Sequence, residues 1–284
     1  MKLSYLWRLL VIAGAIIVLV APFTFLKPTV KVQPEPKVEP PKVVVKKPVV
    51  VEKPLHDVVL PDFAKIRDVK SKKRQFFNFI RPAVIKENNR LKALRVQVEA
   101  MLSQLALGEP LTEEQDQQFT QLVKTYRVNK KASLLQQAYD LYYKVDEIPT
   151  ELVLVQAANE SAWGTSRFAR IGLNFFGIWC YKKGCGMVPR ARNDGATHEV
   201  EAFDSVEHAV VRYLHNINTN SAYSTFRSIR QQLREQNQPL IPAILATGLL
   251  PYSERGADYV LELTEMLRHN QQYFGVENSP QPSE

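Results

Sequence analysis

Cysteine is scarce in this sequence of 284 residues: only Cys180 and Cys185 occur, close together in the stretch WCYKKGCG. Two thiolates cannot complete the tetrahedral shell of a zinc ion, and no histidine stands at ligand spacing beside them. We therefore expect no metal and no other cofactor. The two cysteines either form a disulfide across the short loop or are unpaired thiols, and export from the cytoplasm would favour the disulfide.

The sequence also has no internal repeat and no basic helix with interleaved aromatic residues. Its formal net charge is +8, which favours an anionic partner such as nucleic acid, a membrane surface or a cell-wall glycan. Because the basic and aromatic pattern of nucleic-acid binding is missing, we expect no nucleic-acid partner.

Long uncharged apolar runs are absent except at the N-terminus, where Leu9 to Leu26 carry no charge. A helix of about 18 residues just crosses a hydrocarbon core of about 30 Å. Lys2 and Arg8 precede the run, and positive flanks stay in the cytoplasm. Residues 1–26 are therefore predicted to anchor the chain in the inner membrane, with the rest on the periplasmic side. A cleaved signal peptide, which would leave the protein free in the periplasm, is the alternative.

Proline is concentrated in residues 27–61, in the stretch KPTVKVQPEPKVEPPKVVVKKPVVVEKPLHDVVLP. Proline fixes φ and removes backbone donors, so this segment is predicted to be an extended spacer. Beyond it we expect a helical region at 62–145 that packs on a catalytic domain at 146–275, and then a loose tail at 276–284.

Apolar residues recur at helical spacing after the spacer, and they predict a first helix with a kink near Pro82. Thr112 and Gln115 have the spacing of a capping box at the start of the next helix. The stretch DEIPTELVLVQAANESAWG has little polar surface. Its helix is predicted to be buried on most sides, with Glu160 at the C-terminal end.

Strand signals are confined to GCGMVPRARNDGATHEVEAFDS, where two alternating stretches flank the turn former NDG. This pattern predicts a β-hairpin, and helical spacing returns after it. We therefore predict a mainly α fold with a small β-hairpin lobe, which is an α+β architecture.

Glu160 is the one carboxylate in QAANESAWGTSRFARIGLNFFGIW, a stretch that also contains Trp163 and Trp179. Apolar and aromatic neighbours disfavour the ionised form and raise the pKa of such a carboxyl. A carboxyl that stays protonated near neutral pH suits a general acid, and glycoside hydrolysis requires one beside the leaving oxygen. Aromatic rings offer flat faces to sugars, so the stretch indicates a glycan hydrolase.

The segments VQAANESAWGTSRFA and LNFFGIW, with the late stretch LLPYSERGADYVLELTEML, resemble the glucosaminidases of glycoside hydrolase family seventy-three. The resemblance runs from about Ile148 to Tyr273. It implies a lysozyme-like helical fold and cleavage of the N-acetylglucosaminyl β-1,4 bond of peptidoglycan, so glycan strands are the expected partner. Glu160 matches the catalytic acid of the family.

The same resemblance implies a set of substrate contacts. Residues at the positions that shape or border the family's cleft are expected to bind substrate: Trp163, Asn174, Tyr252 and Tyr259. Gly164 and Gly177 also match the motif, and glycine at such positions serves backbone turns.

A second catalytic acid is harder to place. Relatives often carry one in the first hairpin strand, where this sequence reads MVPRAR. The acids that remain nearby are Asp194, Glu199 and Glu201, and strand alternation puts Glu199 and Glu201 on the same face. Glu199 is predicted to help activate water. A substrate-assisted route, with the N-acetyl group of the sugar as nucleophile, needs no such residue.

Three functions fit these observations. The first is a membrane-anchored, monomeric peptidoglycan hydrolase of the endo-β-N-acetylglucosaminidase type. The second is a lytic transglycosylase, which also uses a single Glu followed by Ser. The third is a non-catalytic wall-binding module, which the missing hairpin acid suggests.

Overall fold

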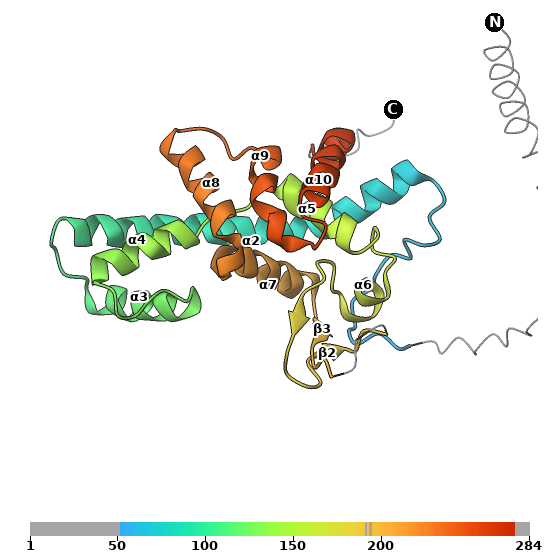
Figure 1. Cartoon of the computed structure of the whole chain (residues 1–284), viewed down its shortest axis with the longest axis horizontal. Helices are drawn as coiled ribbons and strands as arrows, with labels where there is room; N and C mark the ends of the chain where they lie inside the picture. Colours follow the sequence, from blue (N-terminus) through green and yellow to red (C-terminus); the bar gives the residue numbers. More distant parts are fainter. Residues whose placement is uncertain (1–51, 191, 193–194, 276–284) are drawn as a thin grey trace, which may run out of the picture. The chain divides into compact units, whose positions relative to one another are not determined.

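The computed structural model describes residues 52–190, 192 and 195–275, and these fall in one compact unit (Figure 1). The predicted anchor at 1–26, residues 27–51 of the predicted spacer and the predicted tail at 276–284 lie outside the described residues. No helix in the described part of the chain combines the length and the apolar character that crossing a bilayer requires.

The longest element is α2 (Val69–Ala106), whose 38 residues correspond to about 57 Å of helix. Asp68 caps its start, because the carboxylate accepts a hydrogen bond of 2.6 Å from the Ser71 N–H. The helix continues through Pro82, where the sequence predicts a kink. Along its length α2 packs against α4 (Leu134–Lys144), α5 (Thr150–Glu160) and α7 (Val206–Thr219).

Shorter helices complete the fold, and Figure 1 shows α8, α9 and α10 above α7 and the strands below it. The remaining helices are α3 (Glu113–Thr125), α6 (Arg167–Gly172), α8 (Ser224–Glu235), α9 (Pro242–Ala246) and α10 (Ala257–His269). Single 3-10 turns occur at η1 (Ser221–Tyr223), η2 (Thr247–Tyr252) and η3 (Gln271–Tyr273).

Two local predictions about helices are confirmed. Thr112 and Gln115 form the capping box at the start of α3, each side chain bonding the backbone N–H of the other. The helix α5 is buried from Leu152 to Ala158 and ends at Glu160. The short helix α6 lies between the Glu-Ser-x-Trp-Gly and Asn-x-Phe-Gly-Ile segments, and its N-cap is Ser166.

The β lobe is a three-stranded antiparallel sheet in the order β1-β3-β2 rather than a simple hairpin. Its strands are β1 (Trp179–Cys180), β2 (Gly186–Met187) and β3 (Glu199–Glu201). The predicted pairing of β2 with β3 is confirmed, but β1 adds to the other edge of β3. A strand of two residues is too short to leave an alternating pattern in the sequence. The mainly α fold with a small β lobe is confirmed, and it fits the lysozyme-like architecture that the resemblance implies.

The end of the predicted spacer contacts α6. The Leu55 N–H donates to the carbonyl of Ile171 at 2.8 Å, and the carboxylate of Glu52 pairs with Arg167 and Arg190. The part of the spacer from residue 52 onward is thus attached to the folded unit by backbone and charge contacts.

A buried ion cluster joins the N-terminal helices to the start of α5. The carboxylate of Asp146 lies 2.9 Å from Arg234, 3.5 Å from Arg95 and 3.6 Å from Arg230. Arg95 comes from α2, whereas Arg230 and Arg234 come from α8. Burial alone would raise the pKa of Asp146, but these guanidinium groups, Arg230 foremost, hold it below its ordinary value.

Candidate active site

Glu160 is the last residue of α5, and its side chain is half-buried. Burial is the strongest influence on this carboxyl and raises its pKa above the ordinary value. A hydrogen bond from the Tyr259 hydroxyl and the positive charge of Arg255 oppose that rise, while the negative charge of Glu262 adds to it. The structure therefore provides a carboxyl group that holds its proton to a higher pH than an exposed glutamate does.

A chain of hydrogen bonds orients the group that contacts Glu160. The Tyr213 hydroxyl donates to Gln156 Oε1, and Gln156 Nε2 donates to the Tyr259 hydroxyl oxygen at 3.0 Å. Because the Tyr259 oxygen already accepts this bond, its own proton is available for Glu160. Gln156 and Glu160 are four residues apart on α5, so they lie on the same face of the helix.

Aromatic rings surround this hydrogen-bonded chain. Tyr252 stacks on Tyr259 with ring centroids 5.6 Å apart, and Tyr213 stacks on Phe176 at 4.2 Å. The Tyr252 hydroxyl donates to the Phe176 carbonyl at 2.6 Å. The stacked rings exclude water from one side of the Glu160 carboxyl, which is the physical cause of its raised pKa.

The turn after Glu160 explains the Glu-Ser-x-Trp-Gly spacing. Ala162, Trp163 and Gly164 have positive φ values of 50°, 59° and 75°. The Ser161 hydroxyl holds this left-handed turn, since it accepts a bond of 2.8 Å from the Gly164 N–H and donates one of 2.6 Å to Ala157 O. The chain thereby reverses directly after the acid.

The Asn-x-Phe-Gly-Ile segment brings a second backbone stretch to the acid. The Asn174 amide donates to the carbonyls of Ile178 and Glu201, and its oxygen accepts from the N–H groups of Phe176 and Ile178. These bonds give Asn174 a structural role, and its contact with substrate stays a prediction. Gly177 is exposed, and a Cβ added there would lie 3.9 Å from Glu160 Oε2. A side chain at this position would occupy space in front of the acid.

The predicted tyrosines both lie in the wall beside Glu160. Tyr259 is fully buried, whereas Tyr252 is half-buried. Tyr259 therefore contacts the acid from within the protein. Contact of either ring with substrate stays a prediction.

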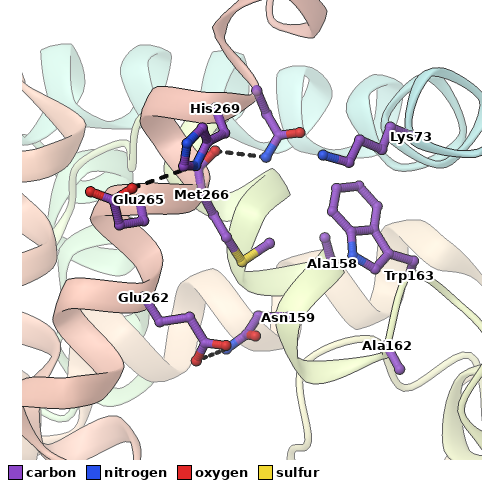
Figure 2. Close-up of a pocket in the computed structure, with 10 residues that line it drawn as sticks. Lys73, Ala158, Asn159, Ala162, Trp163, Glu262, Glu265, Met266 and His269 are labelled. Carbon is purple, nitrogen blue, oxygen red and sulfur yellow. Dashed lines mark hydrogen bonds and ion pairs between the residues drawn. The ribbon is translucent and has the colours of Figure 1, made fainter. Parts of the chain in front are cut away.

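Trp163 lines a pocket that does not include Glu160 among its lining residues (Figure 2). The pocket has a volume of about 440 Å³ and is formed by α2, α5, α10 and the turn after α5. It is lined by Lys73, Ala158, Asn159, Ala162, Trp163, Glu262, Glu265, Met266, His269 and Asn270. The Lys73 ammonium lies 5.2 Å from the centroid of the Trp163 ring. Asn159 and Glu262 line this pocket and also adjoin the acid, because Asn159 precedes Glu160 in the chain and the negative charge of Glu262 raises the pKa of Glu160.

Glu199 lies in the β lobe, where its carboxylate binds backbone. It accepts hydrogen bonds of 3.0 Å from the Gly184 N–H and 2.9 Å from the Gly186 N–H, and these bonds lower its pKa. This arrangement makes Glu199 a brace for the loop between β1 and β2, and its predicted role in activating water stays a prediction. Glu201 pairs with Arg212 at 3.2 Å, and Asp194 lies outside the described residues.

The predicted disulfide between Cys180 and Cys185 is confirmed, with Cα atoms 6.3 Å apart. The two sulfur atoms and a Glu199 oxygen lie within 4.8 Å of one another. Because both sulfur atoms are bonded to each other, neither is available as a thiolate ligand.

Two residues of this site were not singled out from the sequence. Gln156 offered a weak signal, because it is the polar residue of a helix segment that is otherwise apolar from Leu152 to Ala158. Tyr213 offered none, since its hydroxyl reaches Gln156 only through the tertiary packing of α7 against the rest of the domain.

Comparison with known proteins shows the family to which the chain belongs. The Glucosaminidase family model, described as mannosyl-glycoprotein endo-beta-N-acetylglucosaminidase, matches residues 118–272, which is more than half of the chain. The protein therefore belongs to the glucosaminidase family, a family of glycosidases. Protein bax of Escherichia coli (strain K12) is 32% identical over 218 residues, covering 76% of this chain and 76% of that protein. No solved structure matches the chain at a significant level.

Proposed function

We propose that this protein is a peptidoglycan hydrolase that cleaves the N-acetylglucosaminyl β-1,4 bond, with Glu160 as its general acid. The observation that carries the proposal is the half-buried Glu160 carboxyl, whose pKa is raised by burial beside an exposed glycine backbone. Membership of the glucosaminidase family supports a glycosidic substrate. The name of Protein bax, the similar Escherichia coli protein, does not state an activity.

The proposed reaction begins with proton transfer. The Glu160 carboxyl gives its proton to the bridging oxygen while the bond between that oxygen and C1 breaks. In the substrate-assisted route, the carbonyl oxygen of the adjoining N-acetyl group bonds to C1. Water then attacks C1, the acetamido oxygen leaves, and the proton of the water returns to Glu160. The Tyr259 hydroxyl stabilises the carboxylate between these two steps.

Digestion of purified sacculi tests the reaction. The wild-type protein is expected to release soluble fragments with N-acetylglucosamine at the reducing end, detected by mass spectrometry. Glu160→Gln should lower the rate by at least about 100-fold, the usual contribution of a positioned acid, with an unchanged circular dichroism spectrum. Anhydro-muramyl ends would instead identify a lytic transglycosylase. Binding to sacculi without soluble fragments would identify a non-catalytic module.

The anomer of the first product tests the second catalytic group. Retention of configuration, followed by proton NMR during hydrolysis, is expected for the substrate-assisted route. Inversion would require a carboxylate that activates water, as predicted for Glu199. Glu199→Gln is the matched variant. If the route is substrate-assisted, this variant should release the same product anomer as the wild-type protein.

We further propose that the enzyme works on the periplasmic side of the inner membrane. The disulfide between Cys180 and Cys185 supports an oxidising compartment. Alkylation of whole cells before lysis should leave both cysteines unmodified until a reductant is added. Full alkylation without reductant would contradict this location.

A further inference from the structure

The β lobe presents two large aromatic side chains to solvent. Trp179 on β1 is 51% exposed, and Tyr181, two residues later, is 73% exposed. Tryptophan is mostly buried in soluble proteins, so a ring left half in water needs an explanation. Pairing in the sheet does not supply one, since Val200, the cross-strand partner of Trp179, is buried while Trp179 on the edge strand β1 is not.

The exposed ring has a fixed backing. Trp179 stacks in parallel on His198, with ring centroids 4.1 Å apart and an angle of 13° between the planes. His198 precedes β3, and its carbonyl accepts a hydrogen bond of 3.2 Å from Arg192. Here these two rings are called the Trp179–His198 platform. One face of the indole contacts imidazole, and Trp179 nonetheless remains 51% exposed.

The lobe around the platform is braced. The disulfide from Cys180 to Cys185 closes the loop that follows β1, and Glu199 binds the Gly184 and Gly186 N–H groups of the same loop. A ring that is already ordered loses little conformational entropy on binding a ligand. Because the lobe is braced, the platform is better suited to bind a ligand than a mobile surface side chain would be.

The platform lies close to the proposed acid along the chain. Trp179 follows Gly177 by two residues, and the Gly177 backbone lies in front of Glu160 Oε2. Two extended residues span at most about 7 Å. The Trp179 backbone therefore lies close to the Gly177 backbone, which adjoins Glu160. The separation corresponds to the length of one or two sugar rings.

We infer that the Trp179–His198 platform binds a pyranose ring of the glycan strand, on the β-lobe side of the bond to be cleaved. This inference rests on the proposed function, since it concerns the same substrate. A flat indole face contacts the apolar C–H face of a sugar ring. The strength of this attraction depends on the apolar area that the contact buries. Lys182 and Lys183, which follow Trp179 by three and four residues, are exposed, and their positive charges would complement the carboxylates of peptide stems.

Binding is measured first without turnover, with every variant built on Glu160→Gln. The probes are purified sacculi in a pelleting assay and peptide-free glycan strands in a fluorescence titration. Trp179→Ala should weaken binding to both by about 10-fold, and Trp179→Phe should recover most of the loss because it keeps a flat ring. The glycan should also change the tryptophan emission, and that change should be smaller in Trp179→Phe, which keeps Trp163 but lacks the platform indole.

Tyr139→Ala is the matched control. Tyr139 on α4 is also 51% exposed, but it lies far from the β lobe along the chain and should leave binding unchanged. Equal losses in Trp179→Ala and Tyr139→Ala would overturn the inference, as would binding by Trp179→Ala within twofold of its parent. Loss of binding to sacculi with full binding to peptide-free strands would also overturn it, because the ligand would then be the peptide.

Kinetics on the active enzyme separate this inference from the proposed function. Trp179→Ala should raise KM about 10-fold with kcat nearly unchanged, as expected for a contact made equally in the ground and transition states. Hydrolysis with an unchanged KM would overturn the platform and leave the hydrolase standing. Trp179-dependent binding by a wild-type protein that releases no fragments would support the platform and overturn the hydrolase.

Discussion

At the scale of single residues, the behaviour of Glu160 depends on the balance between burial and one hydrogen bond. Burial raises its pKa, and the Tyr259 hydroxyl lowers it. Gln156 sets the direction of that hydroxyl by donating to its oxygen. A carboxyl balanced in this way can serve both as an acid in one step and as a base in the next.

Tyr259→Phe should move the alkaline limb of the pH profile to higher pH. The substitution removes the hydrogen bond that lowers the pKa of Glu160, so the acid should keep its proton further into the alkaline range. The measurement is kcat/KM against pH, which reports the ionisation of the free enzyme. Tyr252→Phe is the control, since its hydroxyl bonds Phe176 O and should leave the limb in place. A limb at the same or lower pH in Tyr259→Phe would contradict the assignment.

Glu160→Gln should raise the melting temperature at neutral pH. Because the folded pKa is raised, the native state holds more protons than the unfolded state above the ordinary glutamate pKa of about 4.3. Wild-type stability from this group therefore falls as pH rises through the window between those two pKa values. Glutamine cannot ionise, so the gain in melting temperature should appear above the window and shrink below it.

Melting curves at several pH values check this expectation. Glu99→Gln, which changes an exposed glutamate of α2, is the matched control and should show no gain that grows with pH. A Glu160→Gln variant that is less stable than wild type at neutral pH would mean that the ionised carboxylate stabilises the fold.

At the scale of elements, much of the helical framework follows from local sequence. The capping box at Thr112 and the end of the apolar stretch at Glu160 mark boundaries that the structure confirms. These signals need only neighbours three or four residues away. The apolar spacing after the β lobe likewise predicts a helix, and α7 begins there after its N-cap Ser205.

Other elements depend on contacts that a sequence pattern does not contain. The strand β1 exists because Trp179 and Cys180 pair with β3 across a gap of about twenty residues, and two residues carry no period of their own. The brace formed by Glu199 depends on the loop that the disulfide closes. A turn after Glu160 could be predicted from the sequence. The contact between the Glu160 carboxyl and Tyr259, however, depends on the packing of α5 on α10.

Gly164→Ala should cost about 3 kcal/mol of unfolding free energy, because the change combines left-handed backbone with overpacking. A Cβ at this position would lie 2.5 Å from the buried Phe63 ring, and φ is +75°. Gly108→Ala is the matched control: its φ is +76°, but nothing lies within 4 Å of the added carbon. It should cost only about 1 kcal/mol. Equal losses in urea unfolding would show that Phe63 moves aside freely.

At the scale of the whole molecule, the Asp146 cluster links the N-terminal helices to the start of α5, the helix that ends at Glu160. Arg95 of α2 and Arg230 of α8 both depend on this one buried carboxylate for charge compensation. Removal of one partner from such a cluster leaves buried charge without compensation. The arrangement explains why helices outside the catalytic motifs contribute to the stability of the unit that carries Glu160.

Asp146→Asn should lower the unfolding free energy by about 3–5 kcal/mol, measured by urea unfolding at neutral pH. Glu265→Gln, which removes an exposed pair with Arg268, is the control and should leave the unfolding free energy nearly unchanged. The folded pKa of Asp146 is lowered, so its contribution is present above the ordinary aspartate pKa of about 3.9 and is lost as pH falls through the folded value. Wild type should therefore lose its advantage over Asp146→Asn in acid. A constant difference across that range would contradict this role.

The most direct test of the central claim is a carbon-13 NMR titration of the glutamate side-chain carboxyls, with Glu160→Gln used to assign the Glu160 signal. We expect the Glu160 carboxyl to titrate above the ordinary glutamate value, with a midpoint that coincides with the alkaline limb of kcat/KM for sacculus hydrolysis. A Glu160 signal that titrates at or below about 4.3, the value of an exposed glutamate, would contradict it.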